Sequence, residues 1–106
     1  MQTIDKLQVR FEFGPEAVPC AWVSSGETIR FSCQDAYAEQ IVRDGLLFSC
    51  MDMARNNPVT GPLHIREARP GDILRVEILD IELEDHVCMC VRPGCGIYEV
   101  EGCHCR

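Results

Sequence analysis

The sequence is poor in lysine and in long apolar runs, and its charge balance is strongly acidic. Lys6 is the single lysine among ten basic residues, and the formal net charge is −7 at pH 7. A nucleic-acid-binding protein needs a basic face to neutralise phosphates, and a lysine-rich membrane patch is also missing, so both classes are excluded. No apolar run approaches the roughly 20 residues of a membrane-spanning helix. We therefore expect neither a nucleic-acid partner nor a membrane partner.

The first residues lack the features of an export signal. Residues 1–6 contain no basic n-region and no apolar h-region, so we expect a cytoplasmic protein in which thiols stay reduced. The length of 106 residues and the 46% hydrophobic content are typical of one soluble globular domain. We expect that single domain to span residues 1–106, with a cysteine-rich C-terminal segment over residues 86–106.

Hydrophobic periodicity predicts a mainly β protein. Alternation of apolar and polar residues, or a short apolar run between turn signals, predicts strands at 7–13, 21–23, 28–33, 63–68, 73–83 and 87–91. Apolar residues at spacings of three and four predict a short amphipathic helix over residues 46–55. Gly26 suits a hairpin turn at 24–27, and Gly71 suits a type II turn at 69–72. The expected fold class is an antiparallel β-sandwich or partly open barrel with one or two short helices.

In the strongest predicted strand, residues 73–83, the alternating apolar residues occupy even positions up to Ile78 and odd positions from Leu79 onward. A bulge at that point would keep one face of the strand inward. Without a bulge, the strand is expected to be buried on both sides.

Eight cysteines fall into two groups. Cys20, Cys33 and Cys50 are spread through the first half and are expected to be small buried hydrophobic residues. The other five lie near the C-terminus, at Cys88, Cys90, Cys95, Cys103 and Cys105, with His86 and His104 among them. Thiolate and imidazole are zinc ligands, and alternate residues of a strand share a face. A metal site at Cys88, Cys90, Cys103 and Cys105, reduced unpaired thiols, and a disulfide or other redox role all remain open.

Signatures of common catalytic sites are missing, because the chain contains no H-x-x-x-H pair, no G-x-S-x-G elbow and no glycine-rich phosphate loop. Asp35 is distinctive because it closes a predicted strand and opens a turn. Such a carboxylate either caps a short helical stretch that begins at Ala36 or holds a ligand or metal at a rigid edge.

Three ordered segments resemble the acetamidase/formamidase family. They are G-E-T-I-R-F-S-C-Q-D-A at 26–36 with Gln40 and Ile41, N-P-V-T-G-P at 57–62, and A-R-P-G-D-I-L-R-V-E-I-L-D-I at 68–81. The later P-G-C-G at 93–96 is also similar to a family segment. The resemblance covers nearly the whole chain and corresponds to the N-terminal portion of the family, whose later histidine-bearing motifs have no counterpart here.

The resemblance implies hydrolysis of short linear amides, such as formamide and acetamide, to carboxylate and ammonia. It also implies a divalent metal, often zinc, with Asp35 as metal ligand or catalytic base. Asn57 and Thr60 match the second motif and would either bind substrate or fix the shape of the loop.

Because only the N-terminal portion is matched, the expected partners are further copies of the chain or a complementary polypeptide carrying the C-terminal half. The alternative is a non-catalytic binding or structural module of the same fold with a Cys/His metal-binding tail. The sequence favours an amidase-family hydrolase, and it does not establish that the chain is active by itself.

Overall fold

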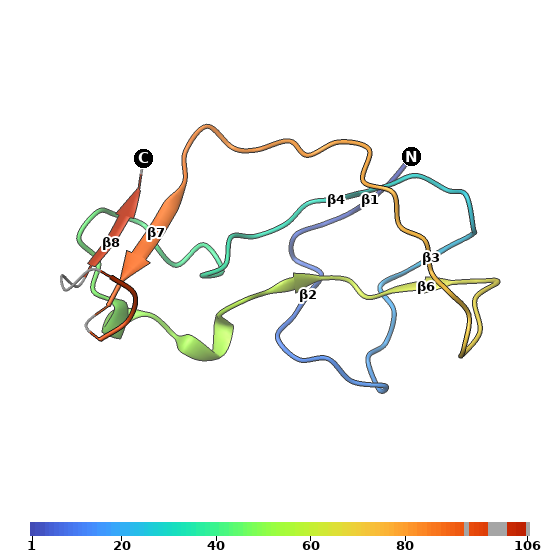
Figure 1. Cartoon of the computed structure of the whole chain (residues 1–106), viewed down its shortest axis with the longest axis horizontal. Helices are drawn as coiled ribbons and strands as arrows, with labels where there is room; N and C mark the ends of the chain where they lie inside the picture. Colours follow the sequence, from blue (N-terminus) through green and yellow to red (C-terminus); the bar gives the residue numbers. More distant parts are fainter. Residues whose placement is uncertain (93, 98–101, 106) are drawn as a thin grey trace.

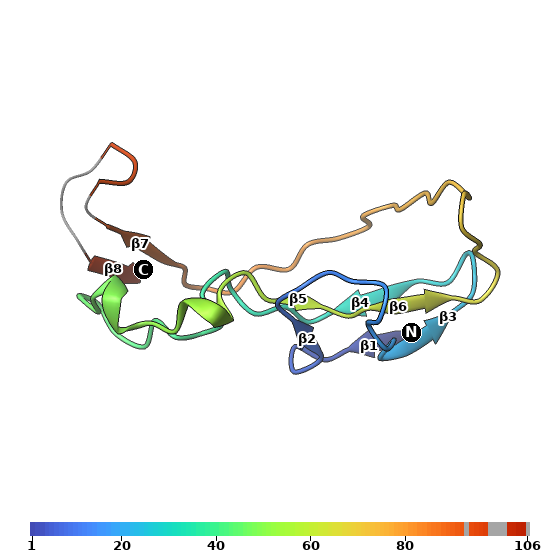
Figure 2. The same cartoon turned by 90° about the horizontal axis from the view of Figure 1, so that it is seen from below.

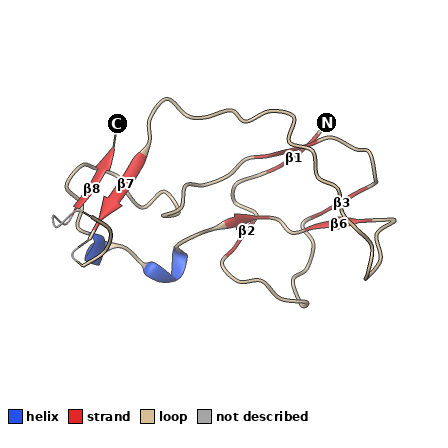
Figure 3. Cartoon of the chain, viewed as in Figure 1, coloured by secondary structure: helices blue, strands red, loops and turns tan. Residues whose placement is uncertain are grey.

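A computed structural model gives the structure of the chain, and it describes residues 1–92, 94–97 and 102–105, the last four by their backbone alone. Short strands and loops dominate the described part (Figures 1 and 3). The strands are β1 (Gln2–Ile4), β2 (Val9–Arg10), β3 (Ala21–Val23), β4 (Ile29–Phe31), β5 (Val59–Thr60), β6 (Leu63–Ile65), β7 (Cys88–Val91) and β8 (Gly102–Cys105). Two 3₁₀ turns, η1 (Phe48–Cys50) and η2 (Met53–Arg55), complete the regular structure of these residues. The prediction of a mainly β chain is confirmed.

The strands pair two by two, and the pairing joins distant parts of the sequence. β1 pairs with β4 and β3 pairs with β6, both in parallel, whereas β2–β5 and β7–β8 are antiparallel. The expectation of antiparallel pairing therefore holds for two of the four described pairs. The described strands form no closed barrel, and the sandwich stays a prediction.

The turns at 24–27 and 69–72 form as predicted, with positive φ at Gly26 and Gly71. The Glu27 N–H donates to the Ser24 carbonyl at 3.2 Å, and the Asp72 N–H donates to the Arg69 carbonyl at 3.0 Å. The first turn does not close a hairpin, because the strands on either side of it pair elsewhere.

The helix predicted over residues 46–55 is wrong, because η1 and η2 occupy this stretch. Between them Met51 has an extended backbone, with φ −92° and ψ 147°, which interrupts the helical path. The Asp52 side chain then accepts a hydrogen bond from the Ala54 N–H at 3.0 Å and starts η2 afresh. Local capping therefore overrides the apolar spacing.

The 73–83 segment is extended but pairs with no strand of the described chain (Figure 1). Figure 2 shows it arching across the molecule from the end of β6 toward β7, away from the paired strands. The prediction of a buried strand here is wrong for this chain, since every residue from 73 to 83 is exposed.

The described core is small. Its buried hydrophobic residues are Ile4, Ala21, Val23, Ala38, Ile41 and Met51. The radius of gyration is 17.1 Å, against about 13 Å for a compact domain of this length. The accessible surface is 8697 Å², whereas a folded protein of this mass exposes about 6,000 Å². The chain is thus an open arrangement of paired strands. No helix in the described residues is long and apolar enough to cross a membrane.

Candidate functional site

Asp35 organises the turn that follows β4. Its Oδ1 accepts hydrogen bonds from the Tyr37 N–H at 2.7 Å and from the Glu39 N–H at 3.2 Å, and the Ala38 N–H donates to its carbonyl at 3.0 Å. This confirms the backbone-capping role, although a turn and not a helix follows. The residue is exposed, and Oδ2 has no hydrogen-bond partner in the described chain. The carboxylate therefore keeps one oxygen accessible.

The same turn holds unusual backbone conformations. Ala38 and Glu39, neither of them glycine, have φ of 54° and 57°. The left-handed region costs such residues about 1–2 kcal/mol each. Ala38 is buried, and Glu39 forms an ion pair with Lys6, so packing and charge hold the turn in place. Conformations of this kind concentrate at functional sites, which marks this turn as a candidate.

The Asn57–Pro62 motif lies against this turn. Asn57 is exposed with φ 53°, and its N–H donates to the Ala36 carbonyl at 2.8 Å. At the far end, Gly61 has φ 130° and precedes a cis bond to Pro62. The Pro62 carbonyl accepts from the Cys20 N–H at 2.9 Å. The motif therefore has a fixed backbone shape.

Thr60 provides the second link between the two segments. Its hydroxyl donates to the Ser32 carbonyl at 3.0 Å, in a partly buried position. Together with the bond from Asn57 to Ala36, it ties the residues around Asp35 to the 57–62 motif. The structure thus brings the segments of Asp35, Asn57 and Thr60 together, with the Thr60 hydroxyl in a structural contact.

Two neighbouring amide side chains were not identified from the sequence as site residues. The Gln34 Nε2 donates to the Lys6 carbonyl at 2.9 Å. The Asn56 Oδ1 is buried and has no hydrogen-bond partner in the described part of the chain. No local pattern identifies either residue, because each position depends on segments distant in the sequence.

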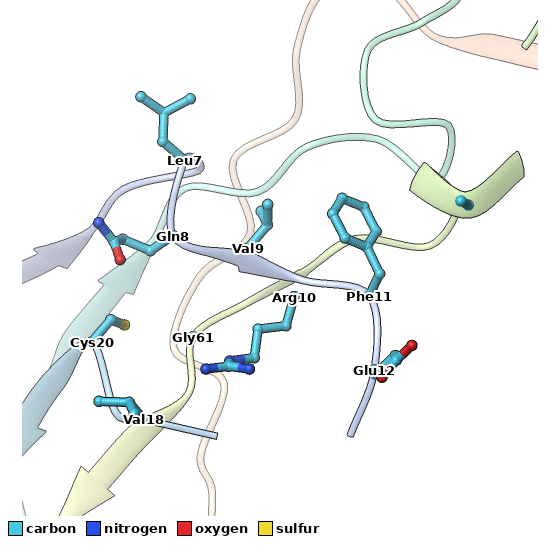
Figure 4. Close-up of a pocket in the computed structure, with 10 residues that line it drawn as sticks. Leu7, Gln8, Val9, Arg10, Phe11, Glu12, Val18, Cys20 and Gly61 are labelled. Atoms are coloured by element: carbon cyan, nitrogen blue, oxygen red, sulfur yellow. The ribbon is translucent and has the colours of Figure 1, made fainter. Parts of the chain in front are cut away.

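An open hollow of about 520 Å³ lies beside this junction. Figure 4 shows β2 and its flanking residues along one side, with Val18, Cys20 and Gly61 also lining it. Its charged lining residues are Arg10 and Glu12. Asp35, Asn57 and Thr60 do not line it, so the hollow is next to the candidate site without containing it.

The cysteines behave differently from the expectation of buried, reduced thiols. Cys20, Cys33 and Cys50 are free as expected, but Cys20 is only half-buried and the other two are exposed. They lie in loops and at the end of η1, where no core is available to cover them.

Four of the five tail cysteines occupy paired positions in the β7–β8 ladder. The register pairs Cys88 with Cys105 and Cys90 with Cys103. Cys88 and Cys90 are each disulfide-bonded, so neither is the reduced thiol expected for a cytoplasmic protein. The side chains of Cys103 and Cys105 lie outside the described residues.

The described residues do not by themselves suit a metal ion. No group of three or more His, Cys, Asp or Glu side chains among them is arranged to hold one. A stable metal site usually needs three or four protein ligands. Asp35 as a metal ligand would therefore require ligands from beyond the described part of the chain.

Comparisons with known proteins agree with this geometry. The profile of the Acetamidase/Formamidase family matches residues 2–96. A Schizosaccharomyces pombe protein named "putative formamidase" is 36% identical over 62 residues, which make up 57% of this chain and 15% of that protein. The crystal structure of an acetamidase from Bacillus halodurans superimposes with a TM-score of 0.91 at 31% identity, over 97% of this chain and 36% of that one.

A solved acetamidase therefore contains the same open backbone path as this chain. The chain spans only about a third of that acetamidase and a smaller share of the yeast protein. The match includes all three segments that carried the resemblance, at 26–36, 57–62 and 68–81. The chain belongs to the acetamidase/formamidase family.

Proposed function

We propose that the chain takes part in the hydrolysis of short linear amides, such as formamide and acetamide, as part of a larger or oligomeric assembly. The observation that carries this proposal is the junction between the Asp35 turn and the Asn57–Pro62 motif. Two family segments meet there through the bonds from Asn57 to Ala36 and from Thr60 to Ser32. The names of the two relatives support the substrate class.

Amide hydrolysis adds water to the carbonyl carbon and releases ammonia. The amide carbonyl is a weak electrophile, so a group must accept the proton of the attacking water and pass it to the departing nitrogen. We assign this role to the Asp35 carboxylate, whose Oδ1 fixes the turn while Oδ2 stays accessible. In the same proposal the exposed Asn57 amide orients the substrate, and Thr60 contributes through an oxygen lone pair while donating to Ser32.

The metal remains a proposal. A divalent ion such as zinc at Asp35 would need further ligands from the rest of the assembly, since the described residues supply no group of three.

The second candidate function is a non-catalytic module with a metal-binding tail. The facing cysteine positions of β7 and β8 favour it, because four thiolates meet the ligand preference of zinc once reduced. In this alternative, Asp35 only caps its turn.

Ammonia release distinguishes the two candidates. The purified chain is assayed with formamide and acetamide, alone and after co-expression with the remaining portion of the Bacillus halodurans acetamidase, with added zinc and with chelator. The proposal expects release in the co-expressed sample and its loss in Asp35→Asn. Glu16→Gln, which removes another exposed carboxylate, is the matched control. Absence of release from a folded, co-purified assembly would overturn the amidase proposal.

A further inference from the structure

The tail hairpin, formed by β7 and β8, carries disulfide-bonded cysteines. Cys88 and Cys90 are each disulfide-bonded. Their positions are paired in the ladder with those of Cys105 and Cys103. The cysteines outside this group are free, namely Cys20, Cys33, Cys50 and Cys95. The disulfides of Cys88 and Cys90 therefore stay within the hairpin and do not link it to the rest of the chain.

The hairpin packs on the segment that follows Asp35. Cys88 and Cys90 share one face of β7, because alternate residues of a strand point to the same side. Both pack against the small cluster of buried Ile41 and Met51. The Cys88 Sγ lies 3.9 Å from the Ile41 carbonyl oxygen. Figures 1 and 2 show the hairpin beside η1 at one end of the molecule. The disulfide-bonded residues are thus the ones that β7 sets against this cluster.

Arg92 adds a second contact to the same cluster. Its guanidinium carbon lies 5.0 Å from the centroid of the Phe48 ring, and Phe48 packs against Ile41 and Met51. Residues 73–87, which lead into β7, are all exposed. The described packing that holds the hairpin in place therefore comes from β7 and the residue that follows it.

Tyr37 connects the cluster to Asp35. It is partly buried and packs against Ile41 and Met51, while its backbone N–H donates to the Asp35 Oδ1 at 2.7 Å. The left-handed backbone of the next two residues persists only where surrounding structure holds it. Loss of packing at Tyr37 is therefore expected to loosen the turn around Asp35.

The hairpin depends on its disulfides because its strands are short. β7 and β8 have four residues each. An isolated two-stranded hairpin is at best marginally stable in water, and a disulfide favours the paired state by restricting the unpaired one. We expect strand pairing to weaken once the disulfides are reduced.

A dithiol supplies the electrons for this reduction. Met89 is 67% exposed and residues 94–97 are exposed, so a small dithiol reaches the hairpin. One thiolate of the dithiol attacks a disulfide sulfur, breaks the S–S bond and forms a mixed disulfide, which the second thiolate then resolves. Each protein disulfide gains two electrons and two protons and becomes two thiols. The dithiol loses the same electrons and protons and becomes a disulfide.

We propose that the tail disulfides form a redox switch for the Asp35 turn. The oxidised hairpin packs on the cluster of Ile41 and Met51 and holds the turn, and reduction by a dithiol releases both. The family profile ends at residue 96, so the hairpin extends beyond the matched residues through β8. The inference rests on the proposed function only in taking the Asp35 turn as the functional site, and its readout is the turn itself.

The test measures amide hydrogen exchange of the full chain, oxidised and then reduced with dithiothreitol. A chelator is present throughout, so that no metal ion bridges the reduced thiols. Exchange at the Tyr37 and Glu39 amides is expected to rise more than about tenfold on reduction and to fall again after reoxidation. The Arg69 amide, which donates to the Asp72 Oδ2 at 2.9 Å at the opposite end of the molecule, is expected to stay unchanged (Figure 1).

Two variants separate the tail disulfides from other effects of the reductant. The double variant Cys88→Ser/Cys90→Ser is expected to show fast exchange at the Tyr37 and Glu39 amides with and without dithiothreitol. Cys33→Ser removes an exposed free thiol close to Asp35 in the sequence and is expected to keep the full redox response.

Three results would overturn the switch. They are equal exchange at Tyr37 and Glu39 in the oxidised and reduced chain, an equal rise at Arg69, and slow exchange at Tyr37 and Glu39 in the double variant. The expected redox response in a sample that releases no ammonia would uphold the switch and overturn only the amidase chemistry. Ammonia release from a chain without the redox response would do the reverse.

Discussion

The side chain of Gln40 forms two hydrogen bonds to the backbone of Asp52. Its Nε2 donates to the Asp52 carbonyl at 3.0 Å, and its Oε1 accepts from the Asp52 N–H at 2.8 Å. The amide thereby satisfies both backbone groups of the residue that caps η2. This contact joins the turn after Asp35 to the stretch that leads into the Asn57–Pro62 motif.

Removing this contact is expected to loosen the junction locally. Gln40→Ala leaves the Asp52 N–H and C=O without their partner, and each such bond contributes about 0.5–1.5 kcal/mol. We expect faster hydrogen exchange at the Asp52 and Ala54 amides. Gln2→Ala, at an exposed position of β1, is the control and is expected to leave those amides unchanged. Unchanged exchange in Gln40→Ala would show that the contact is not needed to hold the junction.

Two substitutions distinguish the turn-capping role of Asp35 from its proposed catalytic role. Asp35→Asn keeps an Oδ1 acceptor for the Tyr37 and Glu39 amides, so the turn is expected to persist while activity of the assembly is lost. Asp35→Ala removes the cap as well and is expected to destabilise the turn by about 1 kcal/mol. Activity is measured by ammonia release, and the turn is followed through the Tyr37 amide exchange. Full activity in Asp35→Asn would reduce Asp35 to a structural cap.

The features of the fold and of the site that the sequence predicted are those whose conformation is determined by residues nearby in the sequence. The Asp35 cap reaches residues two and four positions ahead, and the Arg69–Asp72 turn closes within four residues, so residue type decides both. The parallel register of Gln2 with Ile29 joins segments far apart in the sequence, which periodicity does not encode.

The failed predictions have the same origin. The 46–55 stretch has helical spacing, yet the Gln40 contact with Asp52 and the extended Met51 break it into two turns. The 73–83 stretch has the pattern of a buried strand, yet each of its residues is exposed in the described chain. Apolar periodicity indicates which side chains a strand could bury, and it does not encode which distant segment lies beside the strand.

Thr60 offers a test of the second link at the site. Thr60→Val removes the hydroxyl that donates to the Ser32 carbonyl and leaves a partly buried acceptor unpaired, at a cost of about 1–3 kcal/mol. Thr60→Ser retains the donor and is expected to retain most of the stability. Urea denaturation of the assembly measures both. A loss of stability in Thr60→Ser with none in Thr60→Val would assign the effect to the methyl group and not to the hydrogen bond.

The contact of Glu67 with Ser25 predicts a loss of stability at acidic pH. The Ser25 N–H donates to its Oε2 at 3.0 Å, and this bond holds the pKa of the Glu67 carboxyl below its ordinary value of 4.5. Because the folded pKa lies below the unfolded one, the stabilisation is present above pH 4.5 and is lost as pH falls through the folded pKa. An NMR titration is expected to place the Glu67 midpoint below 4.5. A midpoint at or above 4.5 would contradict the contact.

The tail cysteines give the last prediction, which concerns metal and redox state. A disulfide sulfur carries no thiolate and does not serve as a zinc ligand. The alternative function proposed above requires that Cys88, Cys90, Cys103 and Cys105, whose positions are paired in the β7–β8 register, bind zinc once reduced. We expect the reduced chain to retain one zinc ion after dialysis, measured by elemental analysis, and the oxidised chain to retain none at the tail. The double variant Cys88→Ser/Cys90→Ser is expected to lose that ion. Cys33→Ser, which removes an exposed free thiol, is expected to keep it. Equal zinc content in the reduced wild-type chain and the double variant would exclude these two cysteines as ligands.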